Sequence, residues 1–214
     1  MNVEIKQSID RRKWLETLNV RGESDDALMA KLDKAEQLLF SQAAPKAVYR
    51  VMDIDEVSTC GFSIKKHLEG CDRVAVMGLT LGMGIDNLLR KIQIKDMAMT
   101  VILDCGASLL VEQLCDDFED MIRAETGEKY MTFRFSPGYG DYPITEQGRI
   151  VRYIDAPRKI GLNVTANSLM IPRKSVTALI GIADHPVKGR LATCGECVLK
   201  DKCTLRKEGK FCGD

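Results

Sequence analysis

The sequence has no excess of charge of either sign, because 31 Lys and Arg residues are balanced by 31 Asp and Glu residues. A balanced chain has no overall field to attract a polyanion, so we expect neither a nucleic acid nor an anionic membrane as a partner. The longest apolar run covers only residues 176–183, whereas a membrane-spanning helix needs about 18 apolar residues. Residues 1–16 carry charges throughout and no apolar h-region, unlike a signal peptide, and we therefore expect a cytoplasmic protein.

Cysteine is sparse along most of the chain and concentrated near its C-terminus. Four of the eight cysteines fall in the last 21 residues: Cys194, Cys197, Cys203 and Cys212. In a reducing cytoplasm this clustering favours a metal over disulfides, and nearby basic residues favour an iron–sulfur cluster over zinc. The spacing matches neither a zinc ribbon nor the bacterial ferredoxin pattern, and the alternative is a flexible tail of free thiols. The scattered cysteines are expected to be small core hydrophobes: Cys60, Cys71, Cys105 and Cys115.

Length and patterning predict one large domain with a short appendage. We expect residues 1–188 to form the domain and residues 189–214 to form the cysteine-rich tail. Apolar spacing predicts helices over 24–44, with Ser24 as the N-cap, over 85–92 and over 102–125, and strands over 74–77, 130–135, 160–164 and 176–182. Helices early and strands late, without regular alternation, favour an α+β fold with a mostly antiparallel sheet flanked by long helices.

Two further features have no predicted chemistry. The glycine-rich turn at residues 78–84 lacks the patterns of known phosphate loops, so we favour a tight strand–helix turn over a phosphate cradle. His67 and His185 have no companions at metal-ligand spacing and receive no role.

The predicted helix at 102–125 is apolar on more than one face. Its core face has six members: Leu103, Ala107, Leu110, Leu114, Phe118 and Met121. A second face is less polar than contact with solvent would require, and a helix of this kind is normally sandwiched between layers. Glu112 is the charged member of that second face. It is either a solvated helix charge or a functional carboxylate.

Residues 134–143 leave a predicted strand and enter a loop rich in glycine and proline. Glycine lets another molecule approach the backbone closely, and a guanidinium at a strand end can bind a carboxylate through two hydrogen bonds. Tyr139 and Tyr142 supply flat apolar surface with a polar tip. Together these features suit a small zwitterion that carries an aromatic base and a carboxylate. The alternative is an ordinary turn in which Arg134 is a surface charge.

The segment Arg134-Phe-Ser-Pro-Gly-Tyr139 resembles the Arg-x-x-Pro-Gly-Tyr motif of the activation domain of cobalamin-dependent methionine synthase. Three further segments resemble parts of that domain in the same order. They are the entry segment 10–22, the Leu79-Thr-Leu-Gly82 turn before a helix, and the closing segment 161–176. The resemblance covers most of residues 10–186 and implies the fold of that domain.

The resemblance also implies a site for S-adenosylmethionine (SAM). Carried over by position, Arg134 would hold the methionine carboxylate, while the backbone of Ser136 and the ring of Tyr139 would frame the ligand. A glutamate on the long helix contributes in the family, and Glu112 is its counterpart here. A carboxylate near the sulfonium and ammonium groups and an arginine near the ligand carboxylate would complement both ends of a zwitterion.

The function implied is that of an accessory protein that reactivates a cobalamin-dependent methyltransferase, with methionine synthase as the first candidate. SAM would serve reductive methylation of cob(II)alamin presented by a corrinoid-binding partner. The electron would come from a flavodoxin-like donor or through the Cys194–Cys212 cluster. The protein would position the reactants without an acid, base or nucleophile of its own. Because about 200 residues cannot also hold homocysteine, folate and corrinoid domains, we expect a detached subunit or a separate activator.

The chain departs from the family pattern in two places. Gly140-Asp141-Tyr142 is inserted between the motif and Pro143, where the family commonly has proline directly after the tyrosine. The family's aromatic pair near the SAM and corrinoid site is replaced by Leu179-Ile-Gly-Ile182. These departures motivate an alternative function, a non-catalytic redox or metal-binding module that keeps the fold without binding SAM.

Overall fold

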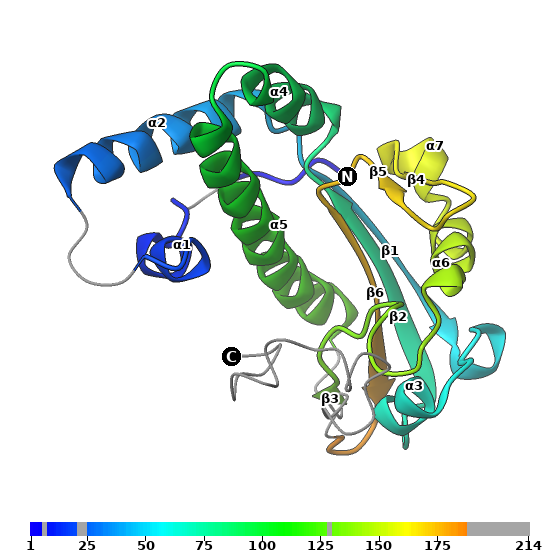
Figure 1. Cartoon of the computed structure of the whole chain (residues 1–214). Coiled ribbons are helices and arrows are strands. Elements are labelled where there is room, and N and C mark those ends of the chain that lie inside the picture. The colour runs from blue at the N-terminus through cyan, green and yellow to red at the C-terminus, as the bar shows by residue number, and fades with distance from the viewer. Residues whose placement is uncertain (6–7, 21–24, 128–129, 188–214) are drawn as a thin grey trace. The chain divides into compact units, whose positions relative to one another are not determined.

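The computed structural model describes residues 1–5, 8–20, 25–127 and 130–187 (Figure 1). These residues form two compact units, each assembled from three stretches of sequence. Unit 1 comprises residues 1–48, 78–122 and 155–176. Unit 2 comprises, among the described residues, 49–77, 123–154 and 177–187.

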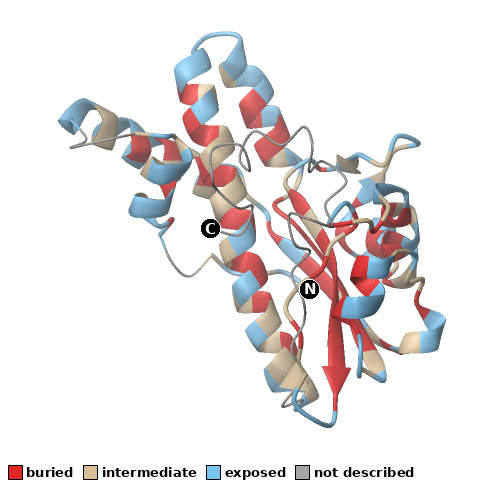
Figure 2. Ribbon diagram, turned by 60° about the horizontal axis from the view of Figure 1, so that its bottom comes forward, coloured by how far each residue is buried: buried red, intermediate tan, exposed pale blue. Residues whose placement is uncertain are grey.

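The main sheet has four strands in the order β1-β2-β6-β3. Their bounds are Lys46–Asp53 for β1, Arg73–Thr80 for β2, Ser175–Ala183 for β6 and Tyr130–Met131 for β3. The two central strands, β2 and β6, are buried over nearly their whole length (Figure 2). β3 runs antiparallel to β6, and a separate antiparallel pair joins β4, Asn163–Val164, to β5, Met170–Ile171.

The helices include the three that the sequence predicts. These are α2 at Asp26–Gln42, α4 at Met83–Gln93 and α5 at Met97–Thr126. Four shorter helices were not predicted: α1 at Arg11–Thr17, α3 at Phe62–His67, α6 at Gln147–Tyr153 and α7 at Ala156–Ile160. Long helices together with antiparallel strands confirm the α+β prediction.

Two details of the predicted elements were wrong. The side chain that caps α2 is Asp25, which accepts a 2.7 Å hydrogen bond from the backbone N of Leu28; the prediction had given this place to Ser24. The predicted strand at 160–164 does not form as such, because Ile160 ends α7 and Gly161 follows in the left-handed region with φ 71°. Only Asn163–Val164 are extended and paired.

The turn between β2 and α4 is the tight strand–helix turn that we predicted. Gly82 precedes α4 with φ 85°, and its backbone N donates to the Thr80 hydroxyl at 3.1 Å. A Cβ atom added at Gly84 would overlap the carbonyl oxygen of Gln42 at the end of α2. Glycine is therefore required at position 84 by the close approach of the two helices.

The long helix α5 is long and apolar enough, by length and composition alone, to cross a membrane. Its most apolar window is 56% buried inside the protein, however, as in the core helix of a globular fold. Of its predicted core face, Met121 is only half-buried and five residues are buried: Leu103, Ala107, Leu110, Leu114 and Phe118. Ile102, Gly106 and Val111 are buried beside them, which confirms that the apolar surface is wider than one stripe.

Within unit 1, Trp14 attaches α1 to α5. The indole is fully buried, and its Nε1 donates a 3.0 Å hydrogen bond to the carbonyl oxygen of Ile102. One turn further along α5 the same ring lies against Gly106, where an added Cβ would overlap the indole. The glycine in the middle of this helix therefore makes room for the tryptophan.

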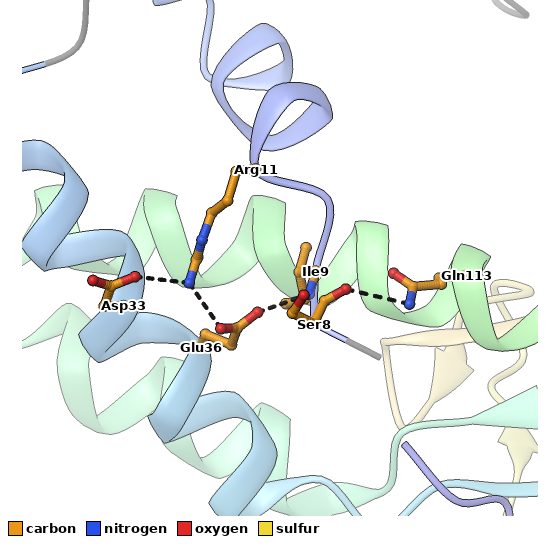
Figure 3. Close-up of polar contacts among 6 residues, drawn as sticks. All are labelled: Ser8, Ile9, Arg11, Asp33, Glu36 and Gln113. Atoms are coloured by element: carbon orange, nitrogen blue, oxygen red, sulfur yellow. Dashed lines mark hydrogen bonds and ion pairs between the residues drawn. The ribbon is translucent and has the colours of Figure 1, made fainter. Parts of the chain in front are cut away.

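Carboxylates of α2 hold the segment that leads into α1 (Figure 3). Arg11 Nη2 donates to Asp33 Oδ1 at 2.9 Å and to Glu36 Oε2 at 2.7 Å. The other oxygen of Glu36 accepts from the backbone N of Ile9 at 2.7 Å. The Arg11 guanidinium also lies 5.3 Å from the centre of the Trp14 ring, within the range of a cation–π contact. The ion pairs and the indole contact together hold Arg11 at the start of α1.

We expect Gly106→Ala to lower the free energy of unfolding by about 1–3 kcal/mol, because the new methyl group would displace the buried indole. The matched control is Gly148→Ala in α6, where an added Cβ meets only the Arg152 guanidinium at 3.8 Å. That substitution should leave stability unchanged or raise it by up to about 1 kcal/mol, because alanine is the better helix former. Urea denaturation of both variants checks this, and equal effects at the two sites would contradict the packing argument.

Candidate functional site

The 134–143 loop leaves the sheet through a β-bulge in unit 2. Met131 pairs with Ile182, and the next pairing joins Phe135 to Leu179. Between these two pairs the first segment advances by four residues and β6 by three, so one extra residue lies within 132–134. The regular alternation predicted for 130–135 is therefore broken there, and only Tyr130–Met131 form a strand.

Two buried polar side chains satisfy the backbone at this bulge. Thr132 donates its N–H to the carbonyl oxygen of Gly181 at 2.9 Å, and its hydroxyl accepts from the Gly181 N–H at 2.8 Å. His67 Nε2 lies 3.0 Å from the carbonyl oxygen of Phe133, which can only accept, so this nitrogen carries the proton. The imidazole also contacts the rings of Phe133 and Phe135, at centroid distances of 4.6 and 4.8 Å. His67, for which we predicted no role, thus helps to hold the segment that carries Arg134.

Three predicted ligand residues lie together in this segment. Arg134 is half-buried and stands directly before Phe135, which is fully buried. Tyr139 is 50% exposed and rests edge-on against Phe135, with ring centroids 5.7 Å apart. The carbonyl oxygen of Ser136 accepts a 3.1 Å hydrogen bond from the Tyr139 N–H. The loop thus combines a guanidinium, backbone polar groups and an accessible aromatic ring.

The inserted residues Asp141 and Tyr142 tie the loop to residues 58–63. Asp141 Oδ2 accepts from the backbone N of Phe62 and Oδ1 from that of Ser63, each at 2.7 Å. These hydrogen bonds, of which those with Ser63 are the strongest cause, lower the pKa of the Asp141 carboxyl. The Tyr142 hydroxyl donates to the carbonyl oxygen of Ser58 at 3.2 Å.

Tyr142 corrects one expectation from the sequence. We had expected both loop tyrosines to offer flat surface to a ligand, but Tyr142 is only 2% exposed. Its burial raises the pKa of the phenol well above the ordinary value. Of the two loop tyrosines, Tyr139 is the one that a ligand can reach, whereas Tyr142 is buried and holds the loop against residue 58.

Ser58 makes hydrogen bonds through three of its own polar groups. Its backbone N donates to the Tyr153 hydroxyl at 3.1 Å, its carbonyl oxygen accepts from Tyr142, and its hydroxyl accepts from Arg149 Nη1 at 3.0 Å. Tyr153 and Arg149 come from α6. The segment to which the loop is tied is therefore anchored in turn.

Glu112 belongs to unit 1, whereas Arg134, Ser136 and Tyr139 belong to unit 2. It is exposed on α5. One and two turns earlier on the same helix face, Lys174 Nζ binds the Ser108 hydroxyl at 2.8 Å and Asp104 Oδ1 at 2.9 Å. The role of Glu112 at the ligand site stays a prediction.

The residues that replace the family's aromatic pair are buried in β6. Leu179, Ile180 and Ile182 are each fully buried, with no exposed surface. They contribute to the hydrophobic core and offer nothing to a ligand. Residues 179–182 therefore provide no exposed aromatic ring in place of the family's aromatic pair.

The predicted metal ligands Cys194, Cys197, Cys203 and Cys212 lie outside the described residues. Elsewhere in the described parts of the chain, no three His, Cys, Asp or Glu side chains are grouped so as to hold a metal. Of the cysteines expected in the core, Cys115 is buried, Cys71 and Cys105 are half-buried, and Cys60 is exposed, contrary to expectation. Burial raises the pKa of the Cys71 thiol to about 11.

Comparison with known proteins identifies one family. The model of the vitamin B12 dependent methionine synthase activation domain matches residues 6–188. No curated protein sequence matches the chain. Among solved structures, the crystal structure of the MetH reactivation domain bound to AdoHcy matches with a TM-score of 0.62 at 15% identity, covering 98% of this chain and 86% of that one. At this identity the likeness concerns the fold alone.

We expect Asp141→Asn to lower the free energy of unfolding by about 1–2 kcal/mol at pH 7, because it weakens two hydrogen bonds to backbone N–H groups. The folded-state pKa of Asp141 is depressed, so its stabilisation is present above the unfolded pKa of about 4 and is lost as the pH falls through the folded value. The gap between wild type and variant should therefore close as the pH drops from 5 to 2, as measured by denaturation at each pH. Asp55→Asn, an exposed position, is the control; a gap at Asp141 that does not change with pH would contradict the charge argument.

Proposed function

The chain belongs to the family of vitamin B12-dependent methionine synthase activation domains, as the motif at Arg134 predicted, and its fold is that of a reactivation domain. On this premise we propose that it is an accessory reactivation subunit for a cobalamin-dependent methyltransferase, with methionine synthase as the first candidate. In this role it binds SAM for the reductive methylation of cob(II)alamin.

The observation that carries this proposal is the 134–143 loop. A half-buried guanidinium at Arg134 and a half-exposed ring at Tyr139 lie five residues apart, on either side of the buried Phe135. This donor set fits SAM, because an arginine binds a carboxylate through paired hydrogen bonds and an aromatic face accepts a flat base or a cationic sulfonium. Glu112 is proposed to lie near the positive end of the ligand. The AdoHcy in the related crystal structure is a product of SAM and supports the same ligand class.

SAM supplies the methyl group, and the protein's own task is to bind and orient it. Arg134 holds the carboxylate, which fixes one end of the ligand at the edge of the sheet. The loop backbone at Ser136 and the Tyr139 ring limit the directions in which the rest of the ligand can point. Holding reactants in a productive geometry accounts for a large part of catalysis when no side chain transfers a proton.

The partners follow from the same proposal. The cobalamin is presented by a corrinoid-binding methyltransferase, and the electron is supplied by a flavodoxin-like donor or through the C-terminal cysteines. We place these events in the cytoplasm, where cysteine thiols stay reduced.

A second function is favoured by two features of the chain. The inserted Gly140-Asp141-Tyr142 and the buried Leu179-Ile-Gly-Ile182 depart from the family pattern at the ligand site. A non-catalytic redox or metal-binding module that retains the fold without SAM would account for both departures. Direct measurement of SAM binding separates the two functions.

We expect wild-type protein to bind SAM in isothermal titration calorimetry and Arg134→Ala to weaken that affinity at least tenfold, because it removes charge-assisted hydrogen bonds that contribute about 1.5–3 kcal/mol. Arg158→Ala is the matched control, since Arg158 in α7 is exposed and pairs with Asp155, the residue directly before that helix. It should bind SAM as wild type does. No binding by wild type would reject the SAM function, whereas an unchanged affinity in Arg134→Ala would reject only the carboxylate role.

For the C-terminal cysteines we propose an iron–sulfur cluster, with zinc as the alternative metal. Protein purified without oxygen should then be brown and absorb visible light, because its iron is bound by thiolates. Replacing Cys194 and Cys197 together by Ser should remove the colour and the metal, while Cys60→Ser, at an exposed position outside the cluster, should not. Colourless protein that contains zinc, or no metal, would reject the iron–sulfur assignment.

A further inference from the structure

We propose that Asp141 and Tyr142 are positioning residues that hold the 134–143 loop in its ligand-binding conformation, so that the insertion preserves the site. The inference rests on the proposed function and assigns a role to residues that the family motif does not contain. Both side chains reach a segment that lies 78 to 84 residues earlier in the chain. We call these contacts, from Asp141 and Tyr142 to residues 58–63, the brace.

The brace acts directly on the ligand residues through the loop backbone. The N–H of Tyr142 donates to the carbonyl oxygen of Tyr139 at 3.0 Å, and the N–H of Tyr139 donates to that of Ser136 at 3.1 Å. The carbonyl oxygen of Tyr142 accepts from the N–H of Gly138 at 2.8 Å. Displacing Tyr142 would therefore break the hydrogen bonds that hold Gly138 and Tyr139 in this loop conformation.

The backbone around the brace is packed closely enough to transmit this restraint. Gly61 adopts φ 128°, and a Cβ atom there would lie only 3.0 Å from the carbonyl oxygen of Asp141. The Asp141 N–H also lies 3.4 Å from the Ser63 hydroxyl, so the contact is reciprocal. Because Ser58 is hydrogen-bonded through three polar groups, residues 58–63 and the loop residues Asp141 and Tyr142 restrain one another.

The physical consequence concerns the entropy of binding. A loop that is ordered before the ligand arrives does not have to be ordered by it, and rigid sites lose less affinity to conformational entropy. The Tyr139 ring is half-exposed and contacts Phe135 edge-on, and its backbone is held by the hydrogen bonds to Ser136 and Tyr142. Without the brace we expect the loop to sample other conformations in the free protein and to bind SAM more weakly.

A purely structural cap would be a different role for Asp141, and the control variant separates the two. Asp25 caps α2 in unit 1 through a 2.7 Å bond to the backbone N of Leu28, which resembles the bonds made by Asp141. Asp25→Ala should therefore cost a comparable amount of stability. Asp25 belongs to unit 1, whereas the SAM loop belongs to unit 2, so the affinity of Asp25→Ala for SAM should equal that of wild type.

The experiment measures SAM affinity by calorimetry and amide hydrogen exchange by NMR on four proteins: wild type, Asp141→Ala, Tyr142→Phe and Asp25→Ala. We expect Asp141→Ala to bind SAM about five- to tenfold more weakly and Tyr142→Phe about two- to threefold more weakly, since only one hydroxyl is lost. In the free protein the amides of Gly138, Tyr139 and Tyr142 should exchange faster in Asp141→Ala and regain protection when SAM is added. Tyr142→Phe keeps the buried ring and serves if Asp141→Ala does not fold.

The outcomes distinguish this inference from the proposed function. If wild type does not bind SAM, the SAM function and the positioning role fall together. If wild type binds and both brace variants bind equally well, or if the three amides exchange at the wild-type rate, only the positioning role is overturned. A loss of affinity in Asp25→Ala equal to that in Asp141→Ala would likewise overturn it, because the effect would then follow global stability.

Discussion

The two 2.9 Å hydrogen bonds between Phe135 and Leu179 fix the point at which the 134–143 loop leaves the sheet. Leu179 lies in β6, where residues 177–183 are buried in succession and therefore on both faces of the strand, so a shift in register would disrupt close packing on each face. The partner segment carries one residue too many for this register, and the bulge at 132–134 absorbs it. Arg134 stands just before the anchor and Tyr139 follows it, so both ligand groups depend on this pairing.

The insertion after the motif shows how such a loop can lengthen without becoming loose. Ordering three more residues costs about 1–2 kcal/mol each. Two charge-assisted hydrogen bonds of Asp141 contribute about 1.5–3 kcal/mol each, and burial of the Tyr142 ring contributes a similar amount. The inserted residues therefore supply interactions of the size needed to offset their own cost. In this chain the family motif is retained, and the inserted Asp141 and Tyr142 hold the loop that carries it.

Elements with several turns of helical spacing or a continuous apolar run were predictable, whereas β1, in which apolar and polar residues are mixed, and the short helices were not. α2, α4 and α5 show apolar residues at helical spacing over several turns, and the central strands β2 and β6 are short apolar runs. α1, α3, α6 and α7 are five to seven residues long, too short to show a period. The alternation at 160–164 was misleading, because the left-handed conformation of Gly161 ends a helix there and local spacing does not report φ.

The sequence by itself determined the fold class, the family and the segment that holds the candidate ligand residues, because these follow from local periodicity and from a contiguous motif. Only the tertiary structure decided that Tyr142 supports the loop while Tyr139 remains accessible, that a bulge precedes Arg134, and that His67 and Asp141 hold the loop in place. The physical reason is distance along the chain. Asp141 meets its partner Phe62 across 79 residues and His67 meets Phe133 across 66, and no local pattern encodes which distant backbone group a buried side chain will satisfy.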